Sequence, residues 1–136
     1  MIAVDTNVLL RALLDDPQAP EQCATARELI VAAGSVAISA VVFLESMWTL
    51  SRSFAFPRRQ VAETGMRLLE HPRYRIESRD LFVGAMRHYL DRGIDFGDAV
   101  ALEQARQDGL VLHTFDRKLA RCPGAQLATK PSPPRG

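Results

Sequence analysis

Four acidic residues stand out because each lies within or just after an apolar segment: Asp5, Glu45, Asp98 and Asp116. Carboxylates that meet without a cation repel one another and raise their own pKa values. A hard dication such as Mg²⁺ or Mn²⁺ prefers oxygen ligands and removes that repulsion. Such a site polarises a phosphoryl oxygen and generates a hydroxide-like nucleophile, which is the chemistry of phosphodiester hydrolysis. The first question is therefore whether these four side chains converge.

Two of the acids follow predicted strands. Asp5 comes directly after Ile2-Ala3-Val4, and Asp116 follows the segment Leu110 to His113 by about one turn. In open parallel sheets, ligands bind beyond the carboxyl ends of the strands. Aspartate is also a favoured N-cap of helices. The sequence leaves both roles open for each residue.

Glu45 interrupts the most apolar predicted helix, residues 40–53. None of the side chains three or four positions away is basic, so no intrahelical ion pair compensates the carboxylate. A desolvated carboxylate without a partner is protonated or is paired with a group from another element. We therefore expect Glu45 to be largely buried, with either a cation or an arginine nearby.

Asp98 lies in the first turn of a helix predicted to begin near Phe96, where the helix dipole favours an acid. Asp95 is three residues earlier on the same face, and we interpret it as the N-cap rather than a ligand. Asp98 is the better ligand candidate because the residues that follow it are apolar. Whether Asp95 joins the site stays open.

The segments that must position these residues alternate between strands and helices. Strands are predicted at 2–4, 35–38, 74–76 and 110–113, and helices at 8–14, 20–33, 40–53, 57–71, 81–90 and 96–107. This alternation favours a parallel sheet covered on both faces. We predict an α/β fold, a three-layer α/β/α sandwich with a central, mostly parallel sheet.

Length and composition are those of one globular domain. The chain has 136 residues, of which 47% are hydrophobic, and a net charge of +1 that neither indicates nor excludes a nucleic-acid partner. No apolar run approaches the ~20 residues needed to cross a bilayer, so we expect a soluble, cytoplasmic protein with no membrane association. We predict a single domain over 1–128 and a disordered tail over 129–136. Cys23 and Cys122 lack zinc-site spacing and are expected to be reduced thiols.

Four motifs occur in order along the chain: Val4-Asp5-Thr6-Asn7-Val8-Leu9-Leu10-Arg11, Val42-Phe43-Leu44-Glu45, Asp95-Phe96-Gly97-Asp98-Ala99 and Thr114-Phe115-Asp116-Arg117-Lys118-Leu119. Together they resemble a PIN domain, specifically the VapC-type toxin ribonucleases, from Met1 to about Leu127. One motif alone is a weak signal, whereas four at suitable separations are specific.

The resemblance implies a PIN-like fold and a divalent-metal-dependent endoribonuclease, acting as the toxin of a toxin–antitoxin pair and leaving 5′-phosphate and 3′-hydroxyl ends. It implies Mg²⁺ or Mn²⁺ as cofactor, with Asp5 and Asp98 as the principal ligands. Asp116 would complete the acidic cluster directly or through water. Glu45 would hold a metal-bound water or a second ion.

Supporting residues and partners are implied in the same way. Thr6 and Asn7 would support the loop that carries Asp5, and Thr114 would orient Asp116 or the bound water. A small antitoxin would occupy the groove, commonly with an arginine reaching the carboxylates, and the toxin would form a homodimer.

Four basic residues are candidates for contacts with RNA or the antitoxin: Arg11, Arg52, Arg117 and Lys118. A salt bridge is the favoured interpretation for Arg11, and an ordinary solvated surface is an equal alternative for Arg52. Arg117 and Lys118 are better phosphate candidates because they adjoin Asp116.

Two other functions remain as alternatives. A receiver-like phosphoacceptor signalling domain has a similar small sheet, but it needs an acceptor aspartate after a middle strand, and here the strand at 35–38 has none. A catalytically silent PIN-like binding module would keep the same acids without cleaving RNA.

Overall fold

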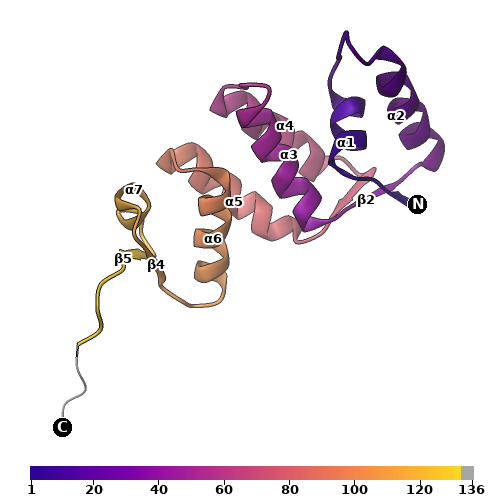
Figure 1. Cartoon of the computed structure of the whole chain (residues 1–136). Helices are drawn as coiled ribbons and strands as arrows, with labels where there is room; N and C mark the ends of the chain where they lie inside the picture. The colour runs from indigo at the N-terminus through magenta and orange to yellow at the C-terminus, as the bar shows by residue number, and fades with distance from the viewer. Residues whose placement is uncertain (133–136) are drawn as a thin grey trace.

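The computed structural model describes residues 1–132. Helices and strands alternate along most of this range (Figure 1): β1 (Ile2–Ala3), α1 (Thr6–Leu13), α2 (Pro20–Ala33), β2 (Val36–Ile38), α3 (Ala40–Arg52), α4 (Arg58–Glu70), β3 (Tyr74–Ile76), α5 (Arg79–Arg92), α6 (Phe96–Gln107), β4 (Leu112–Thr114), α7 (Arg117–Ala120) and β5 (Ala125–Leu127). Residues 133–136 lie outside the described part, so the disordered tail stays a prediction.

Most predicted elements are present, and the differences are local. Helices α2 and α6 have the predicted bounds. The last predicted strand is displaced: β4 begins at Leu112, and the two apolar residues before it are exposed. Elements α7 and β5 were not predicted, because segments of three or four residues are too short to show a periodic pattern.

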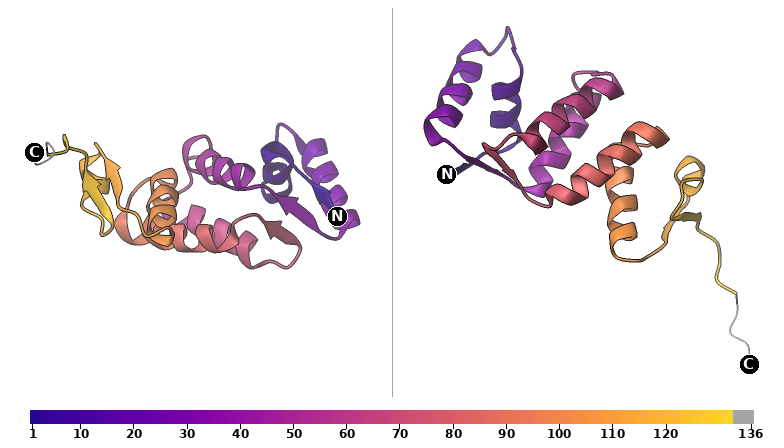
Figure 2. Two further views of the ribbon diagram at one scale, coloured as in Figure 1. Left: turned by 90° about the horizontal axis from the view of Figure 1, so that it is seen from below. Right: turned by 180° about the vertical axis from the view of Figure 1, so that it is seen from behind.

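All strand pairings in the described residues are parallel, which confirms the α/β class and the parallel arrangement. The strands form two sheets instead of one central sheet: a three-stranded sheet in the order β1-β2-β3 and a two-stranded sheet of β4 and β5. The two sheets lie at opposite ends of an elongated molecule, with α3 to α6 between them (Figures 1 and 2). Strands β1 and β4 are therefore both edge strands.

An aromatic cluster in the buried core holds the central helices together. The ring centroids of Phe43 on α3 and Phe82 on α5 are 4.6 Å apart. Phe96, the first residue of α6, stacks on Phe82 at 6.2 Å and contacts the Tyr89 ring edge-on at 5.6 Å. All four rings are buried. This cluster fixes the N-terminal end of α6, which carries Asp98, against α3 and α5.

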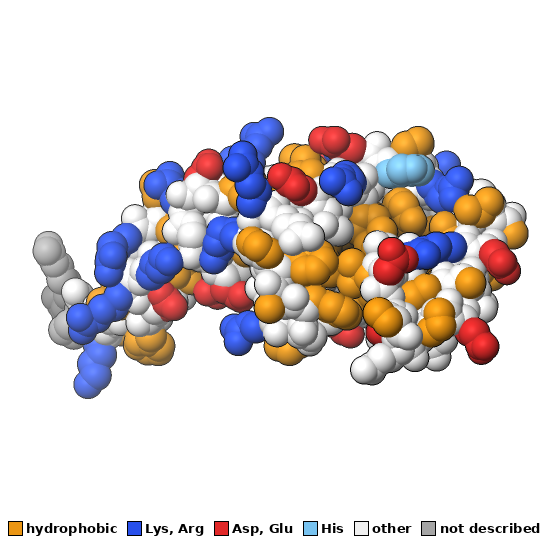
Figure 3. Space-filling view, turned by 90° about the horizontal axis from the view of Figure 1, so that it is seen from above, with side chains coloured by type: hydrophobic (Ala, Val, Ile, Leu, Met, Phe, Trp, Pro, Cys, Tyr) orange, Lys and Arg blue, Asp and Glu red, His pale blue; other side chains and the backbone are white. Residues whose placement is uncertain are grey.

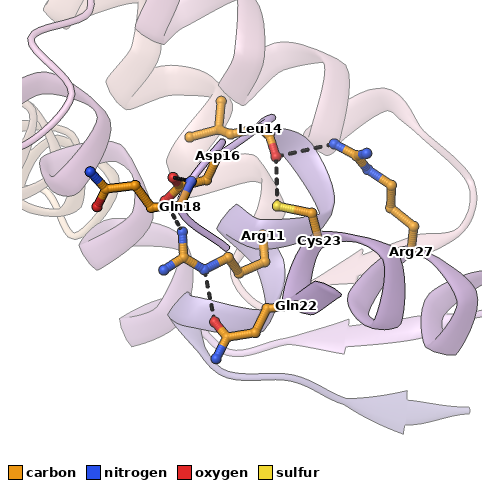
Figure 4. Close-up of polar contacts among 7 residues, drawn as sticks. All are labelled: Arg11, Leu14, Asp16, Gln18, Gln22, Cys23 and Arg27. Carbon is orange, nitrogen blue, oxygen red and sulfur yellow. Dashed lines mark hydrogen bonds and ion pairs between the residues drawn. The ribbon is translucent and has the colours of Figure 1, made fainter. Parts of the chain in front are cut away.

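Polar contacts within the hairpin of α1 and α2 fix the two helices to each other (Figure 4). Arg11 donates to the carboxylate of Asp16 and, from Nε, to Oε1 of Gln22 at 3.1 Å. Arg27 donates to the carbonyl oxygens of Ala12 and Leu14, both at 3.1 Å. These contacts satisfy carbonyl groups at the end of α1 that lack helical partners.

The segment of residues 110–127, here called the C-terminal unit, has little core of its own. Leu119 and Cys122 are its buried residues, and no residue of β4 or β5 is buried. Cys122 and Cys23 are both free and buried, which confirms the prediction of unpaired thiols.

None of the helices in residues 1–132 is long and apolar enough to span a membrane.

Candidate functional site

Asp5 and Asp116 occupy equivalent positions at the ends of two strands. Each follows its strand by two residues and is the N-cap of the next helix. The N–H of Val8 donates to Oδ1 of Asp5 at 3.0 Å, and the N–H of Leu119 donates to Oδ1 of Asp116 at 2.9 Å. Within residues 1–132, Oδ2 of neither carboxylate has a hydrogen-bond partner. The capping role is therefore present and leaves one oxygen of each acid available to a cation.

Thr114, the last residue of β4, holds the loop that carries Asp116. Its Oγ1 accepts a hydrogen bond from the N–H of Asp116 at 3.0 Å. This contact orients the acid through its backbone. Near Asp5 the arrangement differs: Thr6 is buried, Asn7 is exposed, and neither side chain has a hydrogen bond in the described part of the chain.

Asp98 is half-buried in the first turn of α6. Burial raises its pKa above the usual range, and the nearby charges of Asp95 and Asp116 raise it further. The last two causes show that the N-terminal ends of α6 and α7 bring carboxylates into mutual repulsion. This is the effect expected for gathered acids with no cation among them.

Asp95 is the N-cap residue of α6, as predicted, but its side chain makes no capping hydrogen bond. Its Oδ2 instead lies over Gly97, 3.4 Å from where a Cβ atom on that glycine would be. The free carboxylate adds a negative charge beside Asp98, which the sequence signalled only through the three-residue spacing.

Glu45 is exposed, so the prediction that it is largely buried was wrong. The opposite face of α3, which includes Phe43 and Met47, packs into the core, and this turns Val41, Glu45 and Trp48 toward solvent. Glu45 lines a cavity of about 290 Å³ together with apolar residues of α3 and the start of α6, and the acidic N-cap residue Asp95 also lines it. No ion pair involves Glu45 in residues 1–132, so the predicted arginine is not observed there.

The predicted convergence of all four acids is not present within a single chain. No group of three or more His, Cys, Asp or Glu side chains in the described residues is arranged to hold a metal ion. Asp98 and Asp116 are close enough for their charges to interact, whereas Asp5 follows β1 at the other end of the molecule (Figure 1). The acids are thus divided between two parts of the chain.

The basic candidates are in different environments. Arg11 is engaged in the ion pair with Asp16, which confirms its interpretation as a salt bridge. Arg52 is exposed at the end of α3. Arg117 and Lys118 are exposed beside Asp116 and make no ion pair in residues 1–132. These last two remain well placed to contact a phosphate.

Two charged residues that stabilise the fold, Arg58 and Glu103, were not predicted from the sequence. Arg58 donates to the carbonyl oxygens of Tyr89 and Ile94 at 2.9 and 2.6 Å, and its guanidinium lies 4.2 Å from the centroid of the Tyr89 ring. Glu103 is buried and accepts hydrogen bonds from Arg106, Gln107 and His88. Only the three-residue spacing of Glu103 and Arg106 was visible in the sequence.

The acids that carry the proposed chemistry all fall inside one recognised family domain. The family model of the PIN domain matches residues 2–125, a range that begins with β1 and ends at the first residue of β5. This chain belongs to the PIN domain family. Membership confirms the PIN-like fold and removes the receiver-like alternative.

Two solved structures are similar to this PIN domain at low sequence identity. The crystal structure of Mycobacterium tuberculosis VapC20, a sarcin-ricin loop cleaving toxin, is 20% identical with a TM-score of 0.45, and the match covers 88% of this chain and 93% of that one. A toxin–antitoxin complex from Klebsiella pneumoniae is 20% identical with a TM-score of 0.34, over 91% and 93% of the two chains. No match to this chain is found among curated proteins.

Proposed function

We propose that this PIN domain is a divalent-metal-dependent endoribonuclease that acts as the toxin of a toxin–antitoxin system. The observation that carries the proposal is the placement of Asp95, Asp98 and Asp116 near one another at the N-terminal ends of α6 and α7, where burial raises the pKa of Asp98 and the charges of Asp95 and Asp116 raise it further. Like charges held together at this cost suit a site that a cation completes.

The donor chemistry of the acids fits Mg²⁺ or Mn²⁺. Asp98 and Asp116 offer carboxylate oxygens at adjacent helix N-termini, and Asp5 offers a free Oδ2 at the end of β1. Mg²⁺ commonly binds through one or two carboxylates and keeps several waters, so it does not need a complete protein cage. Once bound, the ion would polarise the scissile phosphate and lower the pKa of a bound water.

The remaining residues suit binding and proton transfer. Arg117 and Lys118 are positioned to hold RNA phosphates beside Asp116. Glu45 borders the cavity near Asp95, where its exposed carboxylate can accept a proton from an attacking water. Trp48 is 51% exposed on the same face of α3, where its ring can stack on an unpaired base.

The toxin role rests on the four motifs and on family membership. It implies a cytoplasmic protein with an RNA substrate and a cognate small antitoxin. An antitoxin arginine would be attracted to the uncompensated carboxylates at the N-terminal end of α6. A catalytically silent PIN-like binding module is the competing function.

Cleavage of RNA by purified protein tests the proposal. We expect Mg²⁺- or Mn²⁺-dependent cleavage that excess EDTA abolishes, and a loss of about 100-fold or more in Asp98→Asn. Asp108→Asn, at the other end of α6, is the matched control and should retain wild-type activity. Activity that persists in folded Asp98→Asn contradicts the assignment. An inactive wild type that still binds RNA supports the silent module instead.

A further inference from the structure

The C-terminal unit lacks the cover that a parallel sheet normally has. Parallel sheets occur almost entirely with both faces buried, and a two-stranded sheet alone has marginal stability. Here no residue of β4 or β5 is buried. Four large apolar side chains of the unit are 41–85% exposed: Leu110, Val111, Phe115 and Leu127. The unit therefore presents a surface that another element should cover.

Strand β1, at the other end of the molecule, has an edge that is unpaired in the described part of the chain and to which another strand could bind. Within residues 1–132, β1 pairs with β2 on one side only and β4 pairs only with β5, so each sheet has a free edge. Asp5 and Asp116 lie two residues beyond the last residues of β1 and β4, Ala3 and Thr114. Parallel pairing of β1 with β4 would thus place both acids at the same edge of one sheet.

The connection between α6 and β4 is too short to bring these strands together within one chain. It consists of residues 108–111, which span about 14 Å when fully extended. Helix α6 is fixed by the Phe96 contacts at its start and by the hydrogen bond that Glu103 accepts from His88 on α5. The C-terminal unit is therefore kept at the end of the molecule opposite β1 (Figure 2).

The chain exposes more surface than a compact monomer of its mass. The chain exposes 8721 Å², whereas a compact monomer of this mass exposes about 7,100 Å². The excess of about 1,600 Å² per chain reflects the elongated shape of the chain and the extended residues after β5, and part of it lies on the exposed apolar side chains of the C-terminal unit, which a second copy could cover.

Charge also favours contact between the two ends of different copies. Residues 1–39 carry two basic and five acidic side chains, whereas residues 110–132 carry four basic and one acidic. The space-filling view shows Lys and Arg side chains gathered at the end of the molecule that bears the C-terminal tail (Figure 3). Opposite charges at the two ends promote association in one register.

We infer that two copies of this chain exchange their C-terminal units, so that β4 of each copy lies beside β1 of the other. The metal site proposed above then combines Asp5 of one copy with Asp98 and Asp116 of its partner. The exchange is reciprocal, which closes the assembly as a symmetric dimer. The composition of the site rests on the proposed function, whereas the dimer itself does not.

Mixing two inactive variants tests the shared site. Asp5→Asn and Asp116→Asn should each be inactive alone. After they are unfolded and refolded together, half of the dimers are mixed, and each mixed dimer has one intact site. About a quarter of the wild-type activity should therefore return. No recovery, in a wild type that cleaves RNA, overturns the exchange while leaving the proposed function standing.

The solution mass tests the dimer without reference to activity. Light scattering should give twice the 15.1 kDa of one chain. Phe115→Arg should weaken association at least about tenfold, whereas Leu90→Arg on α5, also an exposed apolar residue, should not. Circular dichroism checks that both variants fold. A monomeric wild type overturns the inference, as does a dimer that Phe115→Arg leaves unchanged.

Discussion

At the scale of single residues, two of the acids have a structural role that an amide can also fill. Asp5 and Asp116 each cap a helix through Oδ1 alone. Asparagine caps helices about as well as aspartate, so replacing either residue with asparagine removes the charge and keeps the cap. Alanine removes both. The two substitutions therefore separate the contribution to function from the contribution to the fold.

We predict that Asp116→Asn abolishes metal-dependent RNA cleavage and leaves thermal stability nearly unchanged. Asp116→Ala should also be inactive but should lose about 1 kcal/mol of stability because the cap of α7 is lost. Thermal unfolding and a cleavage assay on both variants check this. Equal stability of the two variants would show that the cap contributes nothing.

A second residue-scale prediction concerns Asp98, whose pKa is raised by burial, Asp95 and Asp116. A carboxyl with a raised folded-state pKa binds its proton more tightly in the folded protein, so its ionisation costs stability as the pH rises. In metal-free protein at neutral pH, Asp98→Asn should therefore raise the melting temperature, and the gain should vanish at acidic pH. Thermal unfolding of the wild type and of Asp98→Asn, in EDTA and at several pH values, measures this difference. A lower melting temperature of Asp98→Asn than of the wild type at neutral pH would contradict the prediction.

The pKa of Glu103 is shifted in the opposite direction from that of Asp98. Hydrogen bonds from Arg106 lower its pKa to about 2 despite its burial, with further contributions from His88 and Gln107. Its stabilisation is complete above the unfolded pKa and is lost as the pH falls from about 4.5 toward 2. Glu103→Gln should cost at most about 3 kcal/mol at neutral pH and flatten the acid limb of the stability curve. Glu28→Gln, an exposed acid on α2, is the control, and equal losses in the two variants would refute the role of Glu103.

At the scale of elements, Arg58 ties the start of α4 to the loop between α5 and α6. Arg58→Ala should destabilise the protein by about 2–3 kcal/mol, because the buried carbonyl groups of Tyr89 and Ile94 lose their charged donor. Arg59→Ala, whose 3.8 Å ion pair with Glu63 is exposed, should change stability by less than about 0.5 kcal/mol. Urea unfolding of both variants gives the comparison. A similar cost for the two would contradict the assigned role.

The elements that sequence reasoning located well are those with clear end signals. Pro20 at the start and Gly34 at the end define α2, and Gly109 follows the end of α6. The exposure of Glu45 could not be predicted in the same way. Both faces of α3 carry apolar residues, so the pattern did not show that the face of Val41 and Trp48 would be exposed.

At the scale of the whole molecule, the pairing of strands was the feature that the sequence could not provide. Alternating strands and helices predicted parallel pairing, and the pairings are parallel. Which strands are neighbours depends on contacts between segments far apart in the chain, and no local pattern reports them. The division of the acids between two ends follows from this, because Asp5 and Asp116 follow strands that belong to different sheets.

Binding of Mn²⁺ measured by titration calorimetry tests the central claim most directly, because Asp5 and Asp98 lie in the two parts of the chain that the site must unite. The account predicts that wild-type protein binds Mn²⁺ and that Asp5→Asn and Asp98→Asn each weaken binding at least about tenfold. Asp108→Asn should bind as the wild type does. Wild-type affinity in Asp5→Asn would show that the acids do not share one metal site and would contradict the account.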